Sequence, residues 1–277
     1  MPRFKKMLQL FNYPFFIYAL IGVVLISVSA GIIGTYIISR RLVAISGGVT
    51  HACFGGLGLG YFIGVSPIVT AAVFAVASSL GVEWASSRFR IREDSAIAVI
   101  WALGMAIGVV FVFMTPGYVP ELNSFLFGNI LTISVADLWA FGIFTAVLSV
   151  FFALAYKKII ACAFDRDFAQ VIGIPAKFIN YAMTVFVAVC IVLTIRLVGV
   201  MLLMSMLSLP IMSAEVFCRR YSSIMALSIV ISVICSVVGL FIGAVADIPC
   251  SAFIVLINAG VFLTAKIFCF ITEKYNS

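Results

Sequence analysis

Residues 15–38 read FFIYALIGVVLISVSAGIIGTYII, a stretch without a single charged side chain. A helix of about 20 apolar residues spans the hydrocarbon core of a bilayer. The stretch is therefore predicted to be a transmembrane helix, and it is too long for the apolar region of a signal peptide. Stretches of similar length and composition recur along the whole chain, which predicts a polytopic α-helical membrane protein.

Several apolar stretches are long enough to cross a membrane. They lie near residues 15–38, 43–64, 67–86, 95–114, 133–156, 179–195, 198–217, 222–244 and 250–271. Arg196 alone separates 179–195 from 198–217, so the pattern predicts eight or nine transmembrane helices. The sequence lacks the alternation typical of an outer-membrane barrel, and no soluble segment is long enough to fold alone. The expected fold is all-α, with residues 1–277 forming a single transmembrane domain.

The composition agrees with a membrane protein. Of the 277 residues, 65% are hydrophobic and 10% are charged, whereas a soluble domain is about 45–50% apolar and about 25% charged. So few charges do not cover a globular surface, which argues against a soluble enzyme or a nucleic-acid-binding domain. The seven cysteines show no paired spacing and lie mostly in apolar stretches, so no disulfide framework is predicted.

Lysine and arginine predict the orientation, because they concentrate on cytoplasmic loops. With Arg40 and Arg41 in the cytoplasm and nine spans, the other basic clusters also fall inside. These clusters are Arg88, Arg90 and Arg92; Lys157, Lys158, Arg166 and Lys177; Arg219 and Arg220; and Lys274. The loop 115–132 falls outside and carries no basic residue. Basic residues within 1–14 oppose this scheme, and a short interfacial helix there would soften the conflict.

Two connecting segments are more than turns. Residues 116–132, PGYVPELNSFLFGNILT, predict a loop with a short helix against the bundle. Residues 163–178, AFDRDFAQVIGIPAKF, form the longest cytoplasmic segment. In it, Asp165 is expected to cap a short helix that Gly173 and Pro175 end. This helix is either a docking surface for another subunit or an ordinary connector, and the pattern alone favours neither.

An ionisable side chain within a membrane span is costly and is a functional hypothesis by default. The candidates are His51, Glu215, Asp247 and Arg196. Pro210 is expected to break the helix that leads to Glu215. A salt bridge between Glu215 and Arg219 or Arg220 is favoured over a transport role. Asp247 has an alternative role as the cap of the last helix.

Four other acids are assigned structural roles. Glu83 lies one turn from the cytoplasmic end of its helix, where it is expected to reach water. Glu93 and Asp94 begin a helix, where acids suit the helix dipole. Asp137 is expected to do the same at the outer start of its span.

His51 is the only histidine, and it lies in the glycine-rich segment 47–64, GGVTHACFGGLGLGYFIG. In a helix, Gly47 shares a face with His51, while Gly56 and Gly60 belong to a row of small residues that lets another helix approach closely. Imidazole is a ligand of Zn, Mn and Fe. His51 is therefore either a metal ligand or a packing residue hydrogen-bonded to a neighbouring backbone group, and both interpretations stay open.

A series of stretches, in this order, resembles the motifs of one transporter family. They are YPFFIYALIG (13–22), GTYIISRRLVAISGGVTHACFGGLGLG (34–60), REDSAIAVIWALGMAIGVV (92–110), NSFLFGNILTIS (123–134), FDRDFAQVIGIP (164–175), RLVGVMLLMSMLSLPIMSAE (196–215) and GLFIGAVADIPCSA (239–252). They are distributed over nearly the whole chain. On these residues the chain resembles the permease subunits of ATP-binding-cassette (ABC) transporters for divalent metals, the zinc, manganese and iron uptake group.

This resemblance implies a permease, not an enzyme, in the bacterial inner membrane. A homodimer would form the pathway, a separate cytoplasmic ATP-binding subunit would hydrolyse ATP, and an extracytoplasmic metal-binding protein would deliver the ion. The ATPase would dock on a coupling element at 164–178 that includes Asp165, Ala169 and Gly173. No permanently bound cofactor and no nucleic-acid partner are expected, because the divalent metal ion is the cargo.

The resemblance also implies a metal pathway. His51 matches the family's histidine of the second helix, and Asp247 matches an acid often found before the last helix. The family's acid four positions before the histidine is Gly47 here, and a neighbouring proline is also replaced by glycine. Two copies of His51 across the dimer axis, with Cys53 or Thr50, could still form a site.

Alternatives to this function stay open. The metal is Zn, Mn or Fe, and the residues do not choose among them. A permease for a metal chelate or a cobalamin-like substrate would share the architecture, although such chains are usually longer. A membrane carrier that is not driven by ATP would need no coupling element, and an inactive scaffold would tolerate glycine at position 47.

Overall fold

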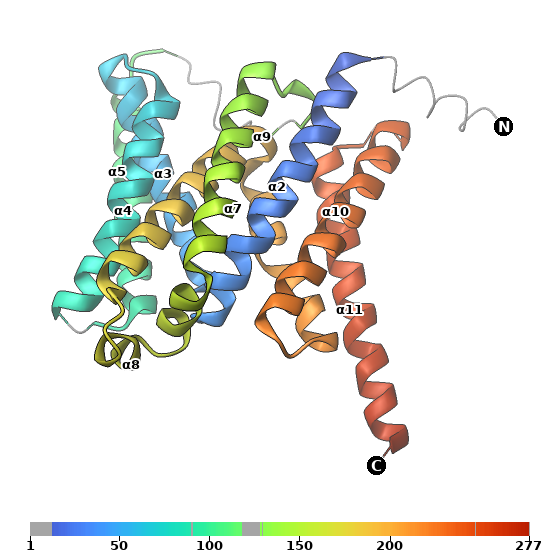
Figure 1. The fold of residues 1–277 in the computed structure, drawn as a ribbon. Coiled ribbons are helices and arrows are strands. Elements are labelled where there is room, and N and C mark those ends of the chain that lie inside the picture. Colours follow the sequence, from blue (N-terminus) through green and yellow to red (C-terminus); the bar gives the residue numbers. More distant parts are fainter. Residues whose placement is uncertain (1–12, 90, 118–127, 129, 247, 277) are drawn as a thin grey trace. The chain divides into compact units, whose positions relative to one another are not determined.

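The computed structural model describes residues 13–89, 91–117, 128, 130–246 and 248–276. Within these residues the regular structure is helical throughout (Figure 1). Eight helices of this part are long and apolar enough to cross a membrane, so the predicted all-α membrane bundle is confirmed. They are α2 (Pro14–Ser39), α3 (Val43–Ile63), α4 (Pro67–Phe89), α5 (Glu93–Met114), α7 (Val135–Phe164), α9 (Ala176–Phe217), α10 (Tyr221–Ala246) and α11 (Cys250–Asn276). The short helices are η1 (Ile130–Thr132) and α8 (Arg166–Val171).

Residue contacts divide the chain into two compact units. The α3–α5 unit comprises Tyr36–Asn123 and Leu148–Arg196, and the α10–α11 unit comprises Met1–Thr35, Ser124–Val147 and Leu197–Ser277. Helices α2, α7 and α9 each contribute one part to each unit. The single transmembrane domain expected from the sequence stays a prediction.

Two predicted segments lie largely outside the described residues. These are the interfacial helix within 1–14 and the short helix within 116–132, of which 1–12 and 118–127 are not described. Helix α7 begins just after them with a reciprocal cap. The hydroxyl of Ser134 donates to the Asp137 carboxylate at 2.6 Å, and the Asp137 amide donates back to that hydroxyl at 3.2 Å. The capping role predicted for Asp137 is therefore confirmed.

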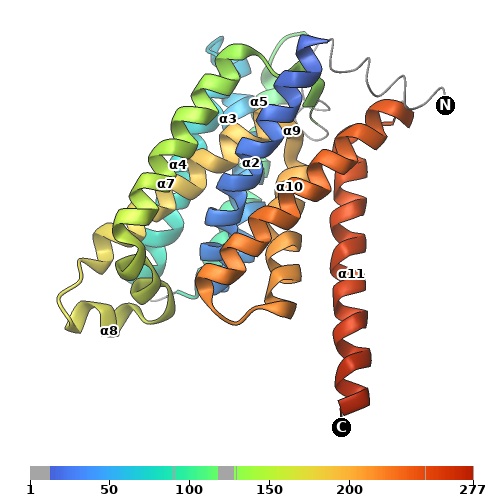
Figure 2. The ribbon, with the colours of Figure 1, turned by 45° about the vertical axis from the view of Figure 1, so that its right-hand side comes forward.

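Glycines of α3 determine the packing of the α3–α5 unit. A Cβ atom at Gly56 would lie 2.5 Å from the carbonyl oxygen of Thr70 on α4. On the other side, a Cβ at Gly58 would lie 2.5 Å from the carbonyl oxygen of Gly108 on α5. Gly60 also faces Thr70. Because only glycine allows helices to come this close, α3 packs directly on both neighbours, and Figures 1 and 2 show the three helices side by side.

In the α10–α11 unit, α10 and α11 form an antiparallel hairpin (Figure 2). A Cβ at Gly239 would lie 2.9 Å from the Cα of Ile254, and one at Gly243 would lie 2.9 Å from the Cα of Cys250. Phe16 of α2 packs edge-on against Phe241 of α10, with ring centroids 5.0 Å apart. Small residues thus bring helices together in this unit as well.

Helix α9 is broken at Gly199. A straight helix of its 42 residues would be about 63 Å long, roughly twice the thickness of the hydrocarbon core. Gly199 has φ 80° and ψ 171°, a backbone conformation that essentially only glycine accepts. The break leaves stretches 176–198 and 200–217, which are 23 and 18 residues long. The predicted division of this region is present, but it falls at Gly199 and not at Arg196, which keeps a helical conformation.

Gly128 packs directly on the backbone at this break. A Cβ atom at Gly128 would overlap the peptide between Val198 and Gly199. The φ of 59° at Gly128 is also in the left-handed region that favours glycine. Two glycines that are far apart in the sequence therefore make one close contact possible.

Pro210 does not break its helix, contrary to the prediction. Helix α9 continues through Pro210 with helical dihedral angles. Proline removes one i→i−4 hydrogen bond. The hydroxyls of Ser208 and Ser213 each donate to a backbone carbonyl one turn earlier, at 2.7 Å. Neither carbonyl is that of Met206, which lacks the amide of residue 210 as a donor. The neighbouring side chains Leu207, Ile211 and Ala214 are buried, and such packing lets a membrane helix keep a proline.

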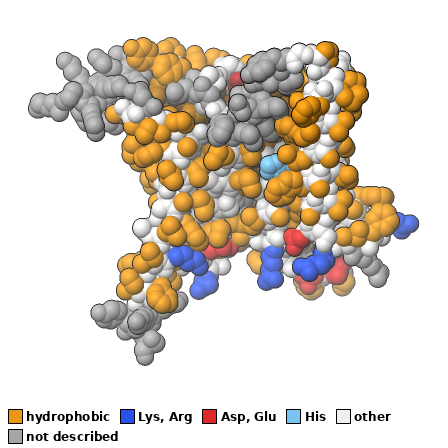
Figure 3. All heavy atoms as spheres, turned by 180° about the vertical axis from the view of Figure 1, so that it is seen from behind, with side chains coloured by type: hydrophobic (Ala, Val, Ile, Leu, Met, Phe, Trp, Pro, Cys, Tyr) orange, Lys and Arg blue, Asp and Glu red, His pale blue; other side chains and the backbone are white. Residues whose placement is uncertain are grey.

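Hydrophobic side chains cover most of the molecular face shown in Figure 3. Large apolar side chains that are exposed include Val99, Leu103, Val110, Leu154, Leu256 and Phe270. Soluble monomers rarely expose such extensive apolar surface. These surfaces are therefore suited to lipid or to another membrane-spanning chain.

Candidate functional site

His51 lies on α3, and its imidazole ring stacks on the indole ring of Trp101 from α5. The ring centroids are 4.6 Å apart and the ring planes differ by 6°. The helices that carry the two rings approach closely, since a Cβ at Gly55 would lie 2.8 Å from the carbonyl oxygen of Gly104. The glycine packing of α3 thus brings the rings together and holds the imidazole plane.

The His51 imidazole is half-buried and has no hydrogen-bond partner among the described residues. The interpretation of His51 as a packing residue required a hydrogen bond from the ring to a neighbouring backbone group. The described part of the chain contains no such bond. The packing interpretation therefore has no support from a hydrogen bond in this part of the chain.

The residues expected to assist His51 do not surround it with ligands. Gly47 is buried and has no side chain to offer. Cys53 is 1% exposed, and the buried Thr50 hydroxyl donates to the carbonyl oxygen of Ser46. The described residues contain no group of three or more His, Cys, Asp or Glu that could hold a metal ion. His51 is therefore not part of a complete resident metal site within them.

Two other predicted positions have different outcomes. Asp247 lies outside the described residues, so its roles as a metal ligand or a cap stay predictions. The salt bridge expected between Glu215 and Arg219 or Arg220 is wrong for the described part of the chain. Helix α9 ends before the two arginines, and the electrostatic neighbour of Glu215 is Lys266 of α11.

The short helix predicted after Asp165 is present as α8. The Asp165 carboxylate accepts a hydrogen bond from the amide of Phe168 at 2.9 Å, and Gly173, with φ 82°, ends the turn that follows. Ala169 is fully buried, whereas Phe168 and Val171 are 57% and 85% exposed. Helix α8 therefore has one face against the protein and one apolar face that is open.

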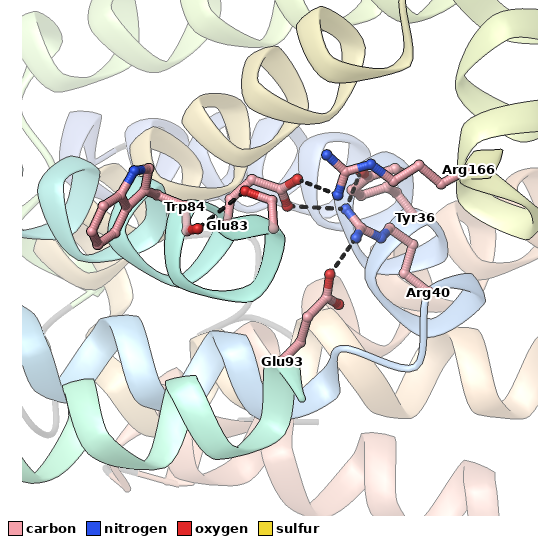
Figure 4. A network of polar contacts seen from close by, with 7 residues as sticks. Tyr36, Arg40, Glu83, Trp84, Glu93 and Arg166 are labelled. Carbon is pink, nitrogen blue, oxygen red and sulfur yellow. Dashed lines mark hydrogen bonds and ion pairs between the residues drawn. The ribbon is translucent and has the colours of Figure 1, made fainter. Parts of the chain in front are cut away.

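Four charged side chains next to α8 form what we term the charge network (Figure 4). The guanidinium of Arg40, just after α2, donates to Glu93 Oε1 at 2.6 Å and to the Tyr36 hydroxyl at 3.1 Å. Arg40 also lies 3.6 Å from Glu83 Oε2 on α4. The other oxygen of Glu83 lies 2.9 Å from a guanidinium nitrogen of Arg166, the first residue of α8. Positive and negative charges thus alternate from α8 to the start of α5.

The charge network is shielded from water at its centre. The side chains of Glu83 and Arg40 are 5% and 9% exposed. Burial by itself lowers the pKa of Arg40, but Tyr36 and the two carboxylates raise this pKa by more, so it stays above its ordinary value. The guanidinium is therefore charged at every physiological pH. A buried charge needs compensation of this kind, because losing one partner typically costs about 3–5 kcal/mol.

The position of Glu83 corrects the prediction that it reaches water. Glu83 is 4% exposed and pairs with two arginines. Glu93 does begin α5 as predicted, and it also pairs with Arg40. The charge network was missed because its members are distant in the sequence. The one available signal was that these acids and arginines were all predicted near the same side of the membrane.

A cavity of about 10 Å³ adjoins the charge network, close to the smallest volume that holds one water molecule. Its lining includes Arg40, Glu83 and Glu93, together with Ser79 of α4 and Thr184 of α9. The Ser79 hydroxyl is buried and has no hydrogen-bond partner among the described residues. The charged groups thus have almost no free volume beside them.

Eight apolar helices with a short helix between α7 and α9 define a multi-pass membrane protein. The chain belongs to the ABC 3 transport family, whose model matches residues 12–269. It is therefore a transport subunit of an ABC system and not an enzyme, and the resemblance of the sequence motifs to this family is confirmed.

Individual relatives cover most of the chain. A Chlamydia pneumoniae protein named "Probable metal transport system membrane protein" is 34% identical over 256 residues, which are 90% of this chain and 86% of that protein. "Manganese transport system membrane protein MntC" of Halalkalibacterium halodurans is 29% identical over 263 residues, 94% of this chain and 89% of that protein. The solved structure of PsaBC from Streptococcus pneumoniae in complex with Fab has a chain with a TM-score of 0.82 and 25% identity, with 95% of both chains covered.

Proposed function

We propose that this chain is the membrane-spanning permease of an ABC importer for a divalent transition metal ion, Zn, Mn or Fe. The family match over residues 12–269 carries the proposal. Relatives named as metal or manganese transport system membrane proteins support it. In this proposal the metal is cargo, a separate ATP-binding subunit supplies the energy, and an extracytoplasmic metal-binding protein delivers the ion to a homodimer of this chain.

We place His51 on the metal pathway. Its half-buried ring, stacked at 4.6 Å on Trp101, has no hydrogen-bond partner in the described part of the chain. A second copy of the chain would cover this face and bring a second imidazole to it. Position 47 is glycine, so no carboxylate lies one turn before His51. An imidazole without a carboxylate makes a weak and transient metal site. A conduit needs such weakness, since the ion must leave.

We assign α8 as the docking helix for the ATP-binding subunit. Phe164, Phe168, Val171 and Phe178 are 57–85% exposed around this short, capped helix. Apolar side chains on a predicted cytoplasmic segment are unfavourable in water and favour a protein partner. Asp165 would stabilise the start of this helix and Gly173 the turn that ends it. The buried Ala169 would pack the helix against the protein.

Cell metal content tests the transport proposal. A deletion strain in metal-limited medium is compared with strains complemented by wild type, His51→Ala or Leu59→Ala, at matched protein levels. We expect one metal to fall on deletion and to return with wild type and Leu59→Ala but not with His51→Ala. Full recovery with His51→Ala would remove His51 from the pathway. If no metal changes under any limitation, metal import itself is wrong.

Co-purification tests the docking proposal. The chain is purified together with its cognate ATP-binding subunit as wild type, as Phe168→Asp/Val171→Asp, and as Phe113→Asp, which changes an 86% exposed side chain on α5. We expect only the α8 variant to lose the subunit. Retention of the subunit by the α8 variant would show that docking occurs elsewhere, and a wild-type chain that binds no ATPase would refute the importer.

A further inference from the structure

The charge network joins α8 to the rest of the α3–α5 unit, and we propose that it positions α8 and transmits the displacement of α8 to the helices that carry His51 and Trp101. This inference rests on the proposed role of α8 as the ATPase docking helix. Glu83 and Arg166 are positioning residues in this scheme, because they act on transport through α8.

Helix α8 is held from one side only. Its outward residues Phe168 and Val171 are exposed, and Ala169 seats the helix through a small, fully buried side chain. Its charged attachment is the ion contact of 2.9 Å between Arg166 and Glu83, which lacks hydrogen-bond geometry at Glu83 Oε1. An ion pair that is 25% and 5% exposed resists separation of its two charges. The pair therefore decides where α8 lies.

Beyond Glu83, the ion contacts continue toward the helices that carry His51 and Trp101. Arg40 contacts both Glu83 and Glu93, at 3.6 and 2.6 Å. Arg40 lies three residues before the start of α3, which carries His51, and Glu93 is the first residue of α5, which carries Trp101. A shift of Arg166 thus reaches both helices of the ring pair through three ion contacts.

Two physical properties of the charge network suit it to transmit a displacement of α8. Each buried charge is compensated by a partner of opposite sign, so the groups move together or leave a charge unpaired. The adjoining cavity, of about 10 Å³, leaves these groups almost no room to move independently of one another.

The test compares substitution of the buried acid Glu83 with substitution of the exposed acid Asp94. Glu83→Gln preserves shape and removes one network charge. Asp94→Asn removes the charge of an exposed pair, in which Arg92 and Asp94 are 3.9 Å apart and 86% and 60% exposed. Each variant is reconstituted in liposomes with the cognate ATP-binding subunit, and the metal ions transported per ATP hydrolysed are measured together with retention of the subunit.

We expect Glu83→Gln to retain the ATP-binding subunit and ATP hydrolysis but to transport about tenfold less metal per ATP, within the 5–150-fold range of typical coupling energies. Asp94→Asn should stay close to wild type. Arg166→Lys keeps the charge and should preserve most of the metal transport per ATP hydrolysed. Arg166→Gln should lower this ratio. The double variant Glu83→Gln/Arg166→Gln should be no worse than Glu83→Gln alone, because Glu83→Gln already removes the one contact that Arg166→Gln removes.

The outcomes separate this inference from the proposed function. An unchanged ratio in Glu83→Gln and Arg166→Gln, with the subunit bound, would overturn the inference alone. The same loss in Asp94→Asn, or losses that multiply in the double variant, would also overturn it. If Glu83→Gln does not yield folded protein, the comparison of Arg166→Lys with Arg166→Gln decides. A wild-type chain that binds no ATPase would instead refute the proposed function.

Discussion

Replacing Gly56 by alanine should force α3 and α4 apart. A Cβ at Gly56 would lie 2.5, 2.7 and 2.8 Å from three backbone atoms of Thr70 and Ala71, whereas ordinary contacts begin near 3.4 Å. The shortfalls from 3.4 Å are 0.9, 0.7 and 0.6 Å, and backbone atoms cannot rotate away as a side chain does. Overpacking costs about 1–3 kcal/mol, of which better helix propensity returns about 1 kcal/mol.

Gly81→Ala is the matched control, because it adds the same methyl group to a glycine inside α4. The nearest atom to a Cβ at Gly81 is Ile100 Cδ1 at 3.5 Å, an ordinary contact. Alanine should therefore gain the helix propensity there without a clash. The two variants should differ by the overpacking cost of about 1–3 kcal/mol, which corresponds to roughly 2–12 °C in Tm at 2–4 °C per kcal/mol.

Thermal loss of monodisperse protein in detergent measures this difference. Both variants and wild type are heated in parallel and separated by size exclusion, with Gly81→Ala expected at or above wild type and Gly56→Ala below it. If Gly56→Ala is as stable as Gly81→Ala, the close approach of α3 and α4 at Gly56 does not exist, and the argument that glycines determine this packing fails.

Three further predictions concern the break in α9, the cap of α8 and the charge network. Gly199→Ala should abolish most folded protein, because φ 80° and ψ 171° are closed to alanine; a normal yield in membranes would show that α9 is continuous. Asp165→Ala should cost about 0.5–2 kcal/mol of local stability and speed hydrogen exchange of the α8 amides more than Asp167→Ala does, and equal exchange would refute the cap. Arg40→Gln should lower stability by about 3–5 kcal/mol, since it leaves the Glu93 carboxylate unpaired and removes one of the two arginines beside Glu83, while Arg41→Gln at the exposed neighbour should have little effect; similar Tm values for the two would show that the network is not buried.

The membrane helices could be predicted because their signal is local. A run such as 15–38 is long, apolar and uncharged, and those properties alone make it a span whatever its neighbours are. The caps at Asp137 and Asp165 were predictable for the same reason, since each satisfies backbone groups within its own first turn. Local rules failed at Pro210, where the cost of a missing hydrogen bond did not outweigh the packing around α9.

The break and the charge network could not be predicted because both depend on distant residues. Gly199 is one glycine among 21 in the chain, and only its contact with Gly128 and its unusual dihedral angles distinguish it. Glu83 resembles any acid near a helix end until Arg40 and Arg166 are placed beside it. A pattern that reads one helix at a time assigns such a residue to water.

The α3–α5 unit brings together three features that act on each other. The His51–Trp101 ring pair joins α3 and α5, and the glycine contacts bring the backbones of these helices together. The charge network links the starts of both helices to α8. A force on α8 therefore acts on the unit through charges that resist separation and through backbone contacts that resist compression. A loosely packed unit would absorb such a force before it reached the rings. Tight glycine packing is thus as necessary for coupling α8 to His51 as the ion pairs are, and Gly56→Ala should lower metal transported per ATP even in the fraction of protein that folds.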